Sequence, residues 1–147
     1  MVALDDSLPG AAHAQDRLRR EEMIWLTTVR RDGQPQTSAV WFHWDGTDFL
    51  LFSQPTAPKL TNLAADPRVS LHLNGAGYGS DLVVVEGAAD VLPDAATASW
   101  PGPERIAEYY AKYERSLRED LHTSGAEMAA AFSTALRVTP TRWRVNP

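Results

Sequence analysis

Two Asp-Gly pairs constrain the fold of this chain more than any other feature of the sequence. Asp32-Gly33 and Asp45-Gly46 each separate two apolar runs. The Asp-Gly pair is typical of tight hairpin turns, because glycine readily takes the positive φ that such turns require. The three runs over 23–29, 37–44 and 48–53 are therefore predicted to form an antiparallel meander.

A short helix is predicted directly after this meander. Thr56 is a suitable N-cap for a helix over 57–65, which ends before Pro67. Lys59 and Asn62 are three residues apart, so they share one face of this helix near its N-terminus. Unpaired N–H groups and the positive end of the helix dipole favour an anion there, and a lysine strengthens the attraction. The pair predicts a phosphate site, with a solvated helix face as the alternative.

The rest of the chain predicts further strands and helices. Strands are expected over 69–73, 82–92 and 136–145, and helices over 11–22, 94–98, 102–119 and 124–134. Gly87 inside the long strand predicts a bulge. Five or six antiparallel strands with inserted helices predict a small closed or split β-barrel. Residues 1–147 are predicted to form one domain, with 1–10 as a loose arm.

Composition excludes several classes of function. The net charge of −5 argues against a nucleic-acid partner and against an anionic membrane surface. The absence of cysteine excludes disulfides, thiolate metal sites and a cysteine nucleophile, and the four histidines lack zinc-ligand spacing. No apolar run has the length of a membrane span and no signal core is visible, so a cytoplasmic location is expected. The glycine-rich run over 74–79 precedes a predicted strand, which excludes a dinucleotide-binding loop.

The second predicted strand offers a surface for a flat ligand. Its side chains alternate between two faces, with Gln36, Ser38 and Val40 on one and Trp41 on the other. Polar Gln36 and Ser38 among apolar neighbours indicate a face that leaves the core near an open end of the barrel. An ordinary sheet edge is the alternative.

Four further residues are candidates for the same site, and none of them is a nucleophile. Ser53 and Thr56 precede the predicted helix and could add hydroxyl donors to the phosphate site. Arg142 and Trp143 could form a cationic and aromatic clamp, or an exposed edge strand. The sequence contains no catalytic triad or acid/base pair, so the catalytic residue is unknown and a bound redox cofactor is expected to supply the chemistry.

Several of these segments together resemble a known family. They are Thr28–Gln36, Val40-Trp41-Phe42, Phe52-Ser53, Lys59-x-x-Asn62-Leu63 and Asp66–Val69. The chain resembles the pyridoxamine 5′-phosphate oxidase-like split β-barrel superfamily, and more closely its branch of small actinobacterial flavin/deazaflavin oxidoreductases. The resemblance is strongest over 23–92 and weaker over the helices at 94–134. It implies a six-stranded antiparallel split β-barrel of the FMN-binding type, and a homodimer with cofactor sites in clefts between the subunits.

The resemblance also implies which residues hold the cofactor. Its phosphate would lie on Lys59 and Asn62, with Ser53 and Thr56 nearby. Its ring would run along Gln36, Ser38, Val40 and Trp41. The partner subunit would close the cleft through Arg142 and Trp143.

The departures from the family pattern favour one cofactor. The true oxidases hold flavin mononucleotide (FMN) with several basic residues, whereas Ala57 and Pro58 precede Lys59 here and leave one clear cation. A phosphodiester, as in coenzyme F420, carries one negative charge and needs less compensation than a phosphate dianion. The sequence therefore predicts an F420-dependent oxidoreductase that transfers a hydride to a conjugated small organic acceptor. The alternatives are an FMN-dependent enzyme of the same fold, or a non-catalytic module that binds a flavin, a deazaflavin or a tetrapyrrole.

Overall fold

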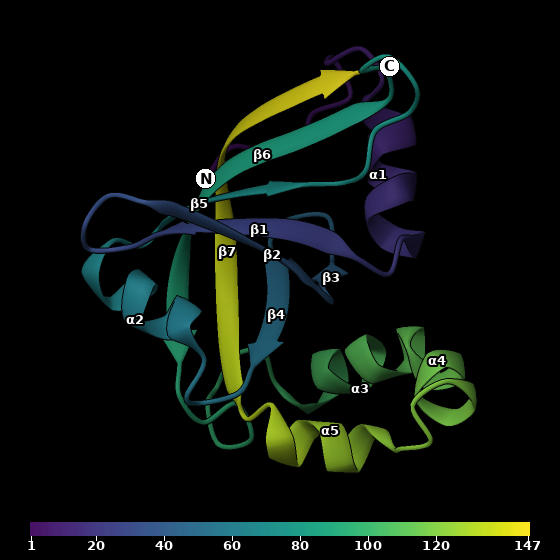
Figure 1. Cartoon of the computed structure of the whole chain (residues 1–147). Helices are drawn as coiled ribbons and strands as arrows, with labels where there is room; N and C mark the ends of the chain where they lie inside the picture. Colours follow the sequence, from purple (N-terminus) through teal and green to yellow (C-terminus); the bar gives the residue numbers. More distant parts are fainter.

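The computed structural model describes residues 1–147 and contains one antiparallel sheet with five helices (Figure 1). The strands are β1 (Ile24–Val29), β2 (Pro35–Val40), β3 (His43–Trp44), β4 (Phe49–Ser53), β5 (Arg68–His72), β6 (Leu82–Leu92) and β7 (Thr134–Asn146). The helices are α1 (Ala11–Arg20), α2 (Pro58–Ala65), α3 (Pro103–Lys112), α4 (Glu114–Glu119) and α5 (Gly125–Ala131). The strand order is β2-β1-β5-β6-β7-β4-β3.

The sheet has seven strands rather than the six expected, because the strand predicted over 37–44 is interrupted. β2 pairs with β1 and β3 pairs with β4, so the two halves of that strand occupy opposite edges of the sheet. The prediction of one three-stranded meander was therefore wrong, although both Asp-Gly turns are present with positive φ at Gly33 and Gly46. Only Trp41 and Phe42 link the two edges, so the sheet must curve strongly to bring them together.

The Tyr113 side chain explains where the strand divides. The β1–β2 ladder ends at Ile24 and Val40, and two positions further on the same register would bring Glu22 opposite Phe42. Instead, the Tyr113 hydroxyl accepts a hydrogen bond from the Phe42 N–H at 2.8 Å and donates one to the Glu22 carbonyl at 2.6 Å. The hydroxyl thus lies between the two strands and replaces their direct bond, which frees the chain after Val40 to turn toward β4.

The helices expected in the second half of the chain are shorter than predicted. The helix predicted over 94–98 is absent, and residues 95–97 form a turn. The Asp94 carboxylate accepts from the Ala96 N–H, and the one helical bond, from the Ala98 N–H to the Asp94 carbonyl, is too few to build a helix. The helix predicted over 102–119 divides into α3 and α4 at Tyr113, whose ring is fully buried.

Thr56 is not an N-cap, because α2 begins one residue later than expected, with Ala57 at its N-cap and no side-chain cap.

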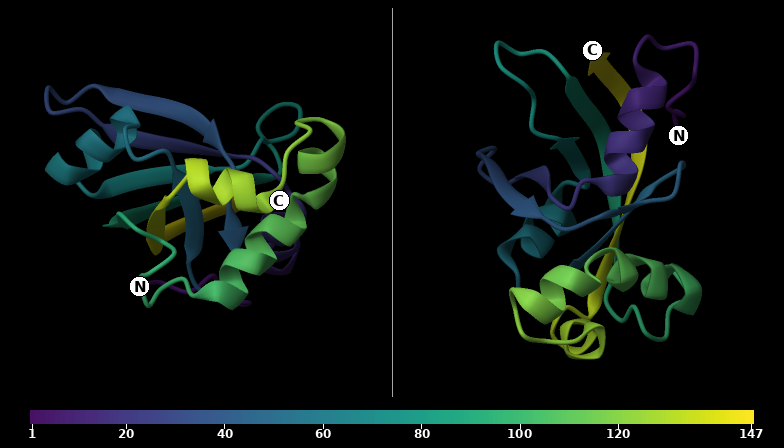
Figure 2. Two further views of the ribbon diagram at one scale, coloured as in Figure 1. Left: turned by 90° about the horizontal axis from the view of Figure 1, so that it is seen from below. Right: turned by 90° about the vertical axis from the view of Figure 1, so that its right-hand side faces the viewer.

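Two apolar clusters form the core. The larger lies inside the curved sheet, and the smaller joins β4 to α3 and α4 through residues such as Leu50, Tyr109 and Leu117. Figure 1 and the right-hand view of Figure 2 show α3, α4 and α5 together at one end of the sheet, with both termini toward the other end. The predicted bulge is confirmed, because the β6–β7 register shifts between Glu86 and Gly87. No helix is long and apolar enough to cross a membrane.

Replacement of Tyr113 by Phe is expected to destabilise the fold by about 1–3 kcal/mol, because the substitution leaves the buried Phe42 N–H and the Glu22 carbonyl without their partner. Urea unfolding would measure the change. Tyr110→Phe is the matched control, since its hydroxyl makes no hydrogen bond in the chain and its loss should leave stability unchanged. Equal stability of Tyr113→Phe and the natural protein would contradict the proposed role of the hydroxyl in the ladder.

Candidate functional site

A small polar pocket lies between the N-terminal turn of α2 and strands β1 and β2. Its volume is about 250 Å³, and no hydrophobic residue lines it. The lining residues are Thr28, Gln36, Thr37, Ser38, Pro58, Lys59 and Asn62. The structure therefore brings together four of the residues predicted from sequence: Gln36, Ser38, Lys59 and Asn62.

The Asn62 side chain connects the elements that form this pocket. Its side chain is only 6% exposed, and its amide donates to Thr28 Oγ1 and to Gln36 Oε1, both at 2.9 Å. These bonds tie α2 to both strands and leave the Gln36 amide Nε2 as a donor toward a ligand. Asn62 thus positions the pocket, and its direct contact with a cofactor stays a prediction. Thr28 was missed by sequence reasoning, although the alternation of β1 places this polar residue on the buried face.

Lys59 is a cation without a partner. Its side chain is half-buried and makes no hydrogen bond or ion pair in the chain, and its backbone N–H also lacks an acceptor. Burial lowers the pKa of its ammonium below the ordinary 10.5. A partly desolvated cation of this kind is stabilised by an anion. Lys59 is the only cationic side chain that lines this pocket or the larger cavity beside it.

The larger cavity is apolar and has a volume of about 400 Å³. Its lining residues are Ala39, Val40, Trp41, Phe52, Lys59, Tyr109, Tyr110, Leu121, Met128 and Phe132. Lys59 belongs to both linings, so the polar pocket and the aromatic cavity adjoin at its side chain. Val40 and Trp41 both face the cavity because β2 ends between them, which breaks the alternation expected from the sequence. The sequence offered Tyr109 and Tyr110 as candidates for an aromatic pocket, with core packing as the alternative, but it did not predict Leu121, Met128 or Phe132 as site residues.

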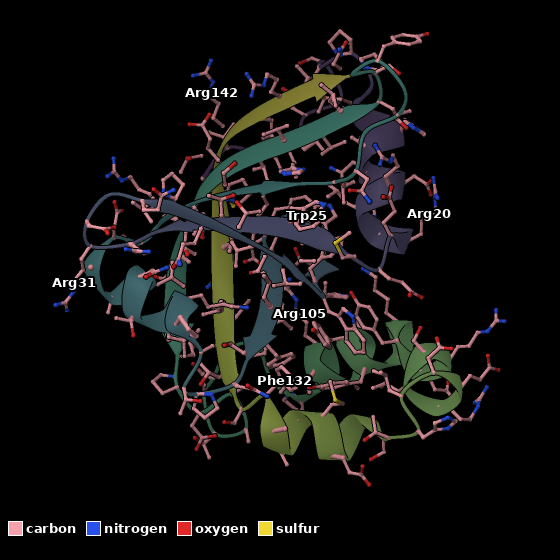
Figure 3. All side chains as sticks on the ribbon, in the orientation of Figure 1. Arg20, Trp25, Arg31, Arg105, Phe132 and Arg142 are labelled. Carbon is pink, nitrogen blue, oxygen red and sulfur yellow. The ribbon has the colours of Figure 1, made fainter.

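The remaining predicted site residues lie outside both spaces. The Ser53 side chain is buried and donates to the Gln54 carbonyl at 2.9 Å, and Thr56 is exposed in the turn before α2. Arg142 is exposed near the C-terminal end of β7, far from Phe132 at the other end of that strand (Figure 3). Trp143 packs edge-on against Trp44 and donates to the Val2 carbonyl within its own subunit. A contribution of either residue across a dimer interface stays a prediction.

A buried ionic cluster fixes the helical wall of the cavity to the sheet. The Asp48 carboxylate is 2% exposed and accepts from Arg105 of α3 at 2.6 Å and from Arg137 of β7 at 2.8 Å. The two guanidinium groups also lie about equally far from the Trp100 ring, at 5.2 and 5.1 Å. Burial, and then the Arg105 charge, lower the pKa of His43, so its neutral ring accepts from Arg105 Nε at 3.2 Å. These contacts hold α3, and with it Tyr109 and Tyr110, in place.

Comparison with known proteins agrees with this geometry. Residues 11–146 match the family described as pyridoxamine 5′-phosphate oxidase. The chain belongs to this family. The family predicted from the sequence is therefore confirmed.

Solved structures extend the comparison within the pyridoxamine 5′-phosphate oxidase fold. An F420 reductase is 27% identical, with 88% of this chain and 94% of that chain covered and a TM-score of 0.66, which supports the deazaflavin branch. A conserved hypothetical protein of Mycobacterium tuberculosis is 26% identical, with 92% and 82% covered and a TM-score of 0.67. An FAD-binding protein of Mesorhizobium loti shares the fold at 21% identity, with 90% and 89% covered and a TM-score of 0.65.

Anion binding at Lys59 is expected to weaken as the pH rises. The ammonium attracts an anion only while protonated, so affinity is full below its lowered pKa and is lost as the pH passes through that value. Dimethyl phosphate is a suitable probe because its single charge is constant, and chemical shifts of the α2 amides would report its binding.

Lys59→Arg should retain affinity at alkaline pH, because guanidinium stays charged. Lys112→Arg is the control, since Lys112 is the only other lysine, is also half-buried with a pKa lowered to about 8, and lines neither space. The same pH profile in the natural protein and in Lys59→Arg would exclude Lys59 as the titrating group.

Proposed function

We propose that this member of the pyridoxamine 5′-phosphate oxidase family is an oxidoreductase that binds coenzyme F420 and transfers a hydride to a conjugated small organic acceptor. One observation carries the proposal: a polar pocket with a single unpaired cation adjoins an apolar, aromatic cavity at Lys59. This arrangement suits a ligand with an anionic group at one end and a flat ring system at the other.

The charge of the polar pocket favours a phosphodiester. Lys59 is its one cation, and the other polar groups in its lining are the neutral side chains of Thr28, Gln36, Thr37, Ser38 and Asn62. One ammonium balances the single charge of a phosphodiester, whereas the phosphate of FMN carries close to two charges at neutral pH. The donor set thus fits F420 better than FMN, in agreement with the similarity to an F420 reductase.

The residues beside Lys59 fit the ring of such a cofactor. Val40 and Trp41 give the cavity an apolar wall next to the polar pocket, and Gln36 Nε2 and the Ser38 hydroxyl can bond polar ring edges. Phe52, Met128 and Phe132 add apolar surface that helps to exclude water from the cavity. When bound in its reduced form, the deazaflavin supplies the hydride. The chain orients the two rings, and the proton comes from solvent.

We further propose that the active form is a cytoplasmic homodimer. Gln36, Thr37, Ser38 and Ala39 of the edge strand β2 are exposed, so one side of the pocket is open in a single subunit. A second copy would cover it. Arg142 of the partner subunit is better suited to reach the site than Trp143 of the partner subunit, because Trp143 is packed within its own subunit.

Titration of the purified protein with F420 and with FMN, followed by cofactor fluorescence, tests the cofactor assignment. We expect F420 to bind at micromolar concentration or tighter, and FMN to bind more weakly. Lys59→Ala should reduce F420 affinity about 10- to 100-fold, because a charge-assisted hydrogen bond is lost, while the unfolding midpoint stays unchanged. Lys112→Ala serves as the control for removal of a half-buried lysine.

Three results would contradict the assignment. Tighter binding of FMN than of F420 would place the protein in the flavin branch. Unchanged F420 affinity in Lys59→Ala would contradict the assignment of the phosphate site to Lys59. Binding of F420 without hydride transfer to any of a panel of enones, quinones and nitroaromatics would indicate a non-catalytic binding module.

A further inference from the structure

Tyr109 is a buried residue whose hydroxyl the fold itself does not use. The residue is 3% exposed and lines the aromatic cavity. Its hydroxyl makes no hydrogen bond in the chain, whereas the hydroxyl of Tyr113, one turn later, bonds to Phe42 and Glu22. A hydroxyl that is held by a largely buried ring and has no partner in the protein is available to a ligand in the cavity.

The cavity is the place where this hydroxyl can find a partner. Every fully buried polar side-chain atom in the molecule has a hydrogen-bond partner. The Tyr109 hydroxyl has no partner, so its oxygen is not fully buried and keeps some accessible area. The accessible space that Tyr109 lines is the aromatic cavity.

Packing fixes the direction of the Tyr109 ring. Phe52 contacts it edge-to-face at 4.7 Å between centroids, Tyr110 lies at 5.0 Å and Tyr113 at 5.4 Å. Contacts on several sides leave the ring little freedom to rotate away. When charge develops next to a donor held in this way, the free-energy cost of reorienting the donor is small.

The chemistry of the cavity keeps this group a donor. Burial, followed by the neighbouring tyrosines, raises the pKa of the Tyr109 hydroxyl well above 10, so it stays protonated at neutral pH. No carboxylate or histidine lines the cavity to take its proton. The other polar groups of the lining are the Tyr110 hydroxyl, the Trp41 indole N–H and the Lys59 ammonium, and the proposed function assigns Lys59 to the cofactor.

We propose that the Tyr109 hydroxyl donates a hydrogen bond to an oxygen of the conjugated acceptor and stabilises the negative charge that this oxygen gains during reduction. This inference rests on the proposed function. The acceptor takes up a hydride at its electron-poor carbon, where a C–H bond forms, and its conjugated π pair moves to the oxygen. That oxygen then takes a proton from solvent, and the two electrons come from the reduced deazaflavin, which is oxidised.

Two unreactive probes separate this hydrogen bond from simple packing. Acetophenone and α-methylstyrene have nearly the same shape, but only acetophenone has an oxygen that can accept a hydrogen bond. Calorimetry on the protein loaded with oxidised F420 should show that acetophenone binds more tightly than α-methylstyrene. Tyr109→Phe should weaken acetophenone about 2- to 12-fold and leave α-methylstyrene unchanged, and the infrared C=O stretch of bound acetophenone should rise. Tyr78→Phe is the control, because Tyr78 is 99% exposed and lines neither space, and it should alter neither probe.

Two outcomes with these probes would overturn the proposal. Unchanged acetophenone affinity and C=O stretch in Tyr109→Phe would show that the hydroxyl does not contact the ligand. Equal weakening of both probes would assign Tyr109 a packing role.

Turnover separates this proposal from the cofactor assignment. With an enone acceptor, Tyr109→Phe should lower kcat more than it raises KM, while F420 affinity stays unchanged. Unchanged kcat with F420 affinity retained would overturn the role of Tyr109 and leave the cofactor assignment intact. Failure of the natural protein to bind F420 would overturn the proposed function instead, and the probes applied to the protein alone would still decide whether the hydroxyl is a donor.

Discussion

The insertion of the Tyr113 hydroxyl between Glu22 and Phe42 determines the shape of the rest of the molecule. It ends the β1–β2 ladder and sends the chain from one edge of the sheet to the other. The Tyr113 ring stacks on the Trp41 indole with 4.1 Å between the ring centroids, and this contact holds the indole in the wall of the aromatic cavity. Because Tyr113 also lies at the break between α3 and α4, one side chain connects the curvature of the sheet with the position of its helical cover.

Local signals in the sequence predicted the parts of the fold that depend on near neighbours. The Asp-Gly turns, the bulge at Gly87 and the position of Lys59 follow from the conformational needs of a few adjacent residues. The division of the second strand could not be predicted in this way, because it depends on a hydroxyl 71 positions away from Phe42. The bond from Asn62 to Thr28 spans 34 positions and was missed for the same reason.

The two halves of the candidate site differ in how far the sequence describes them. The polar pocket is built from β1, β2 and α2, where the family motifs lie, and its residues were largely predicted. The cavity takes half of its lining residues from the segment after β6, where the resemblance is weak and the pattern looks like ordinary core packing: Tyr109, Tyr110, Leu121, Met128 and Phe132. A shared fold supports many functions, so the acceptor must be inferred from this less familiar wall rather than from the family.

The shared position of Lys59 links the two spaces thermodynamically. An anion in the polar pocket draws the ammonium toward itself and leaves the adjoining cavity lined by aromatic and aliphatic carbon. Without the anion, the same charge borders the cavity. With the cofactor that we propose in place, an apolar acceptor would meet a more hydrophobic surface, and the two ligands would raise each other's affinity through a single side chain.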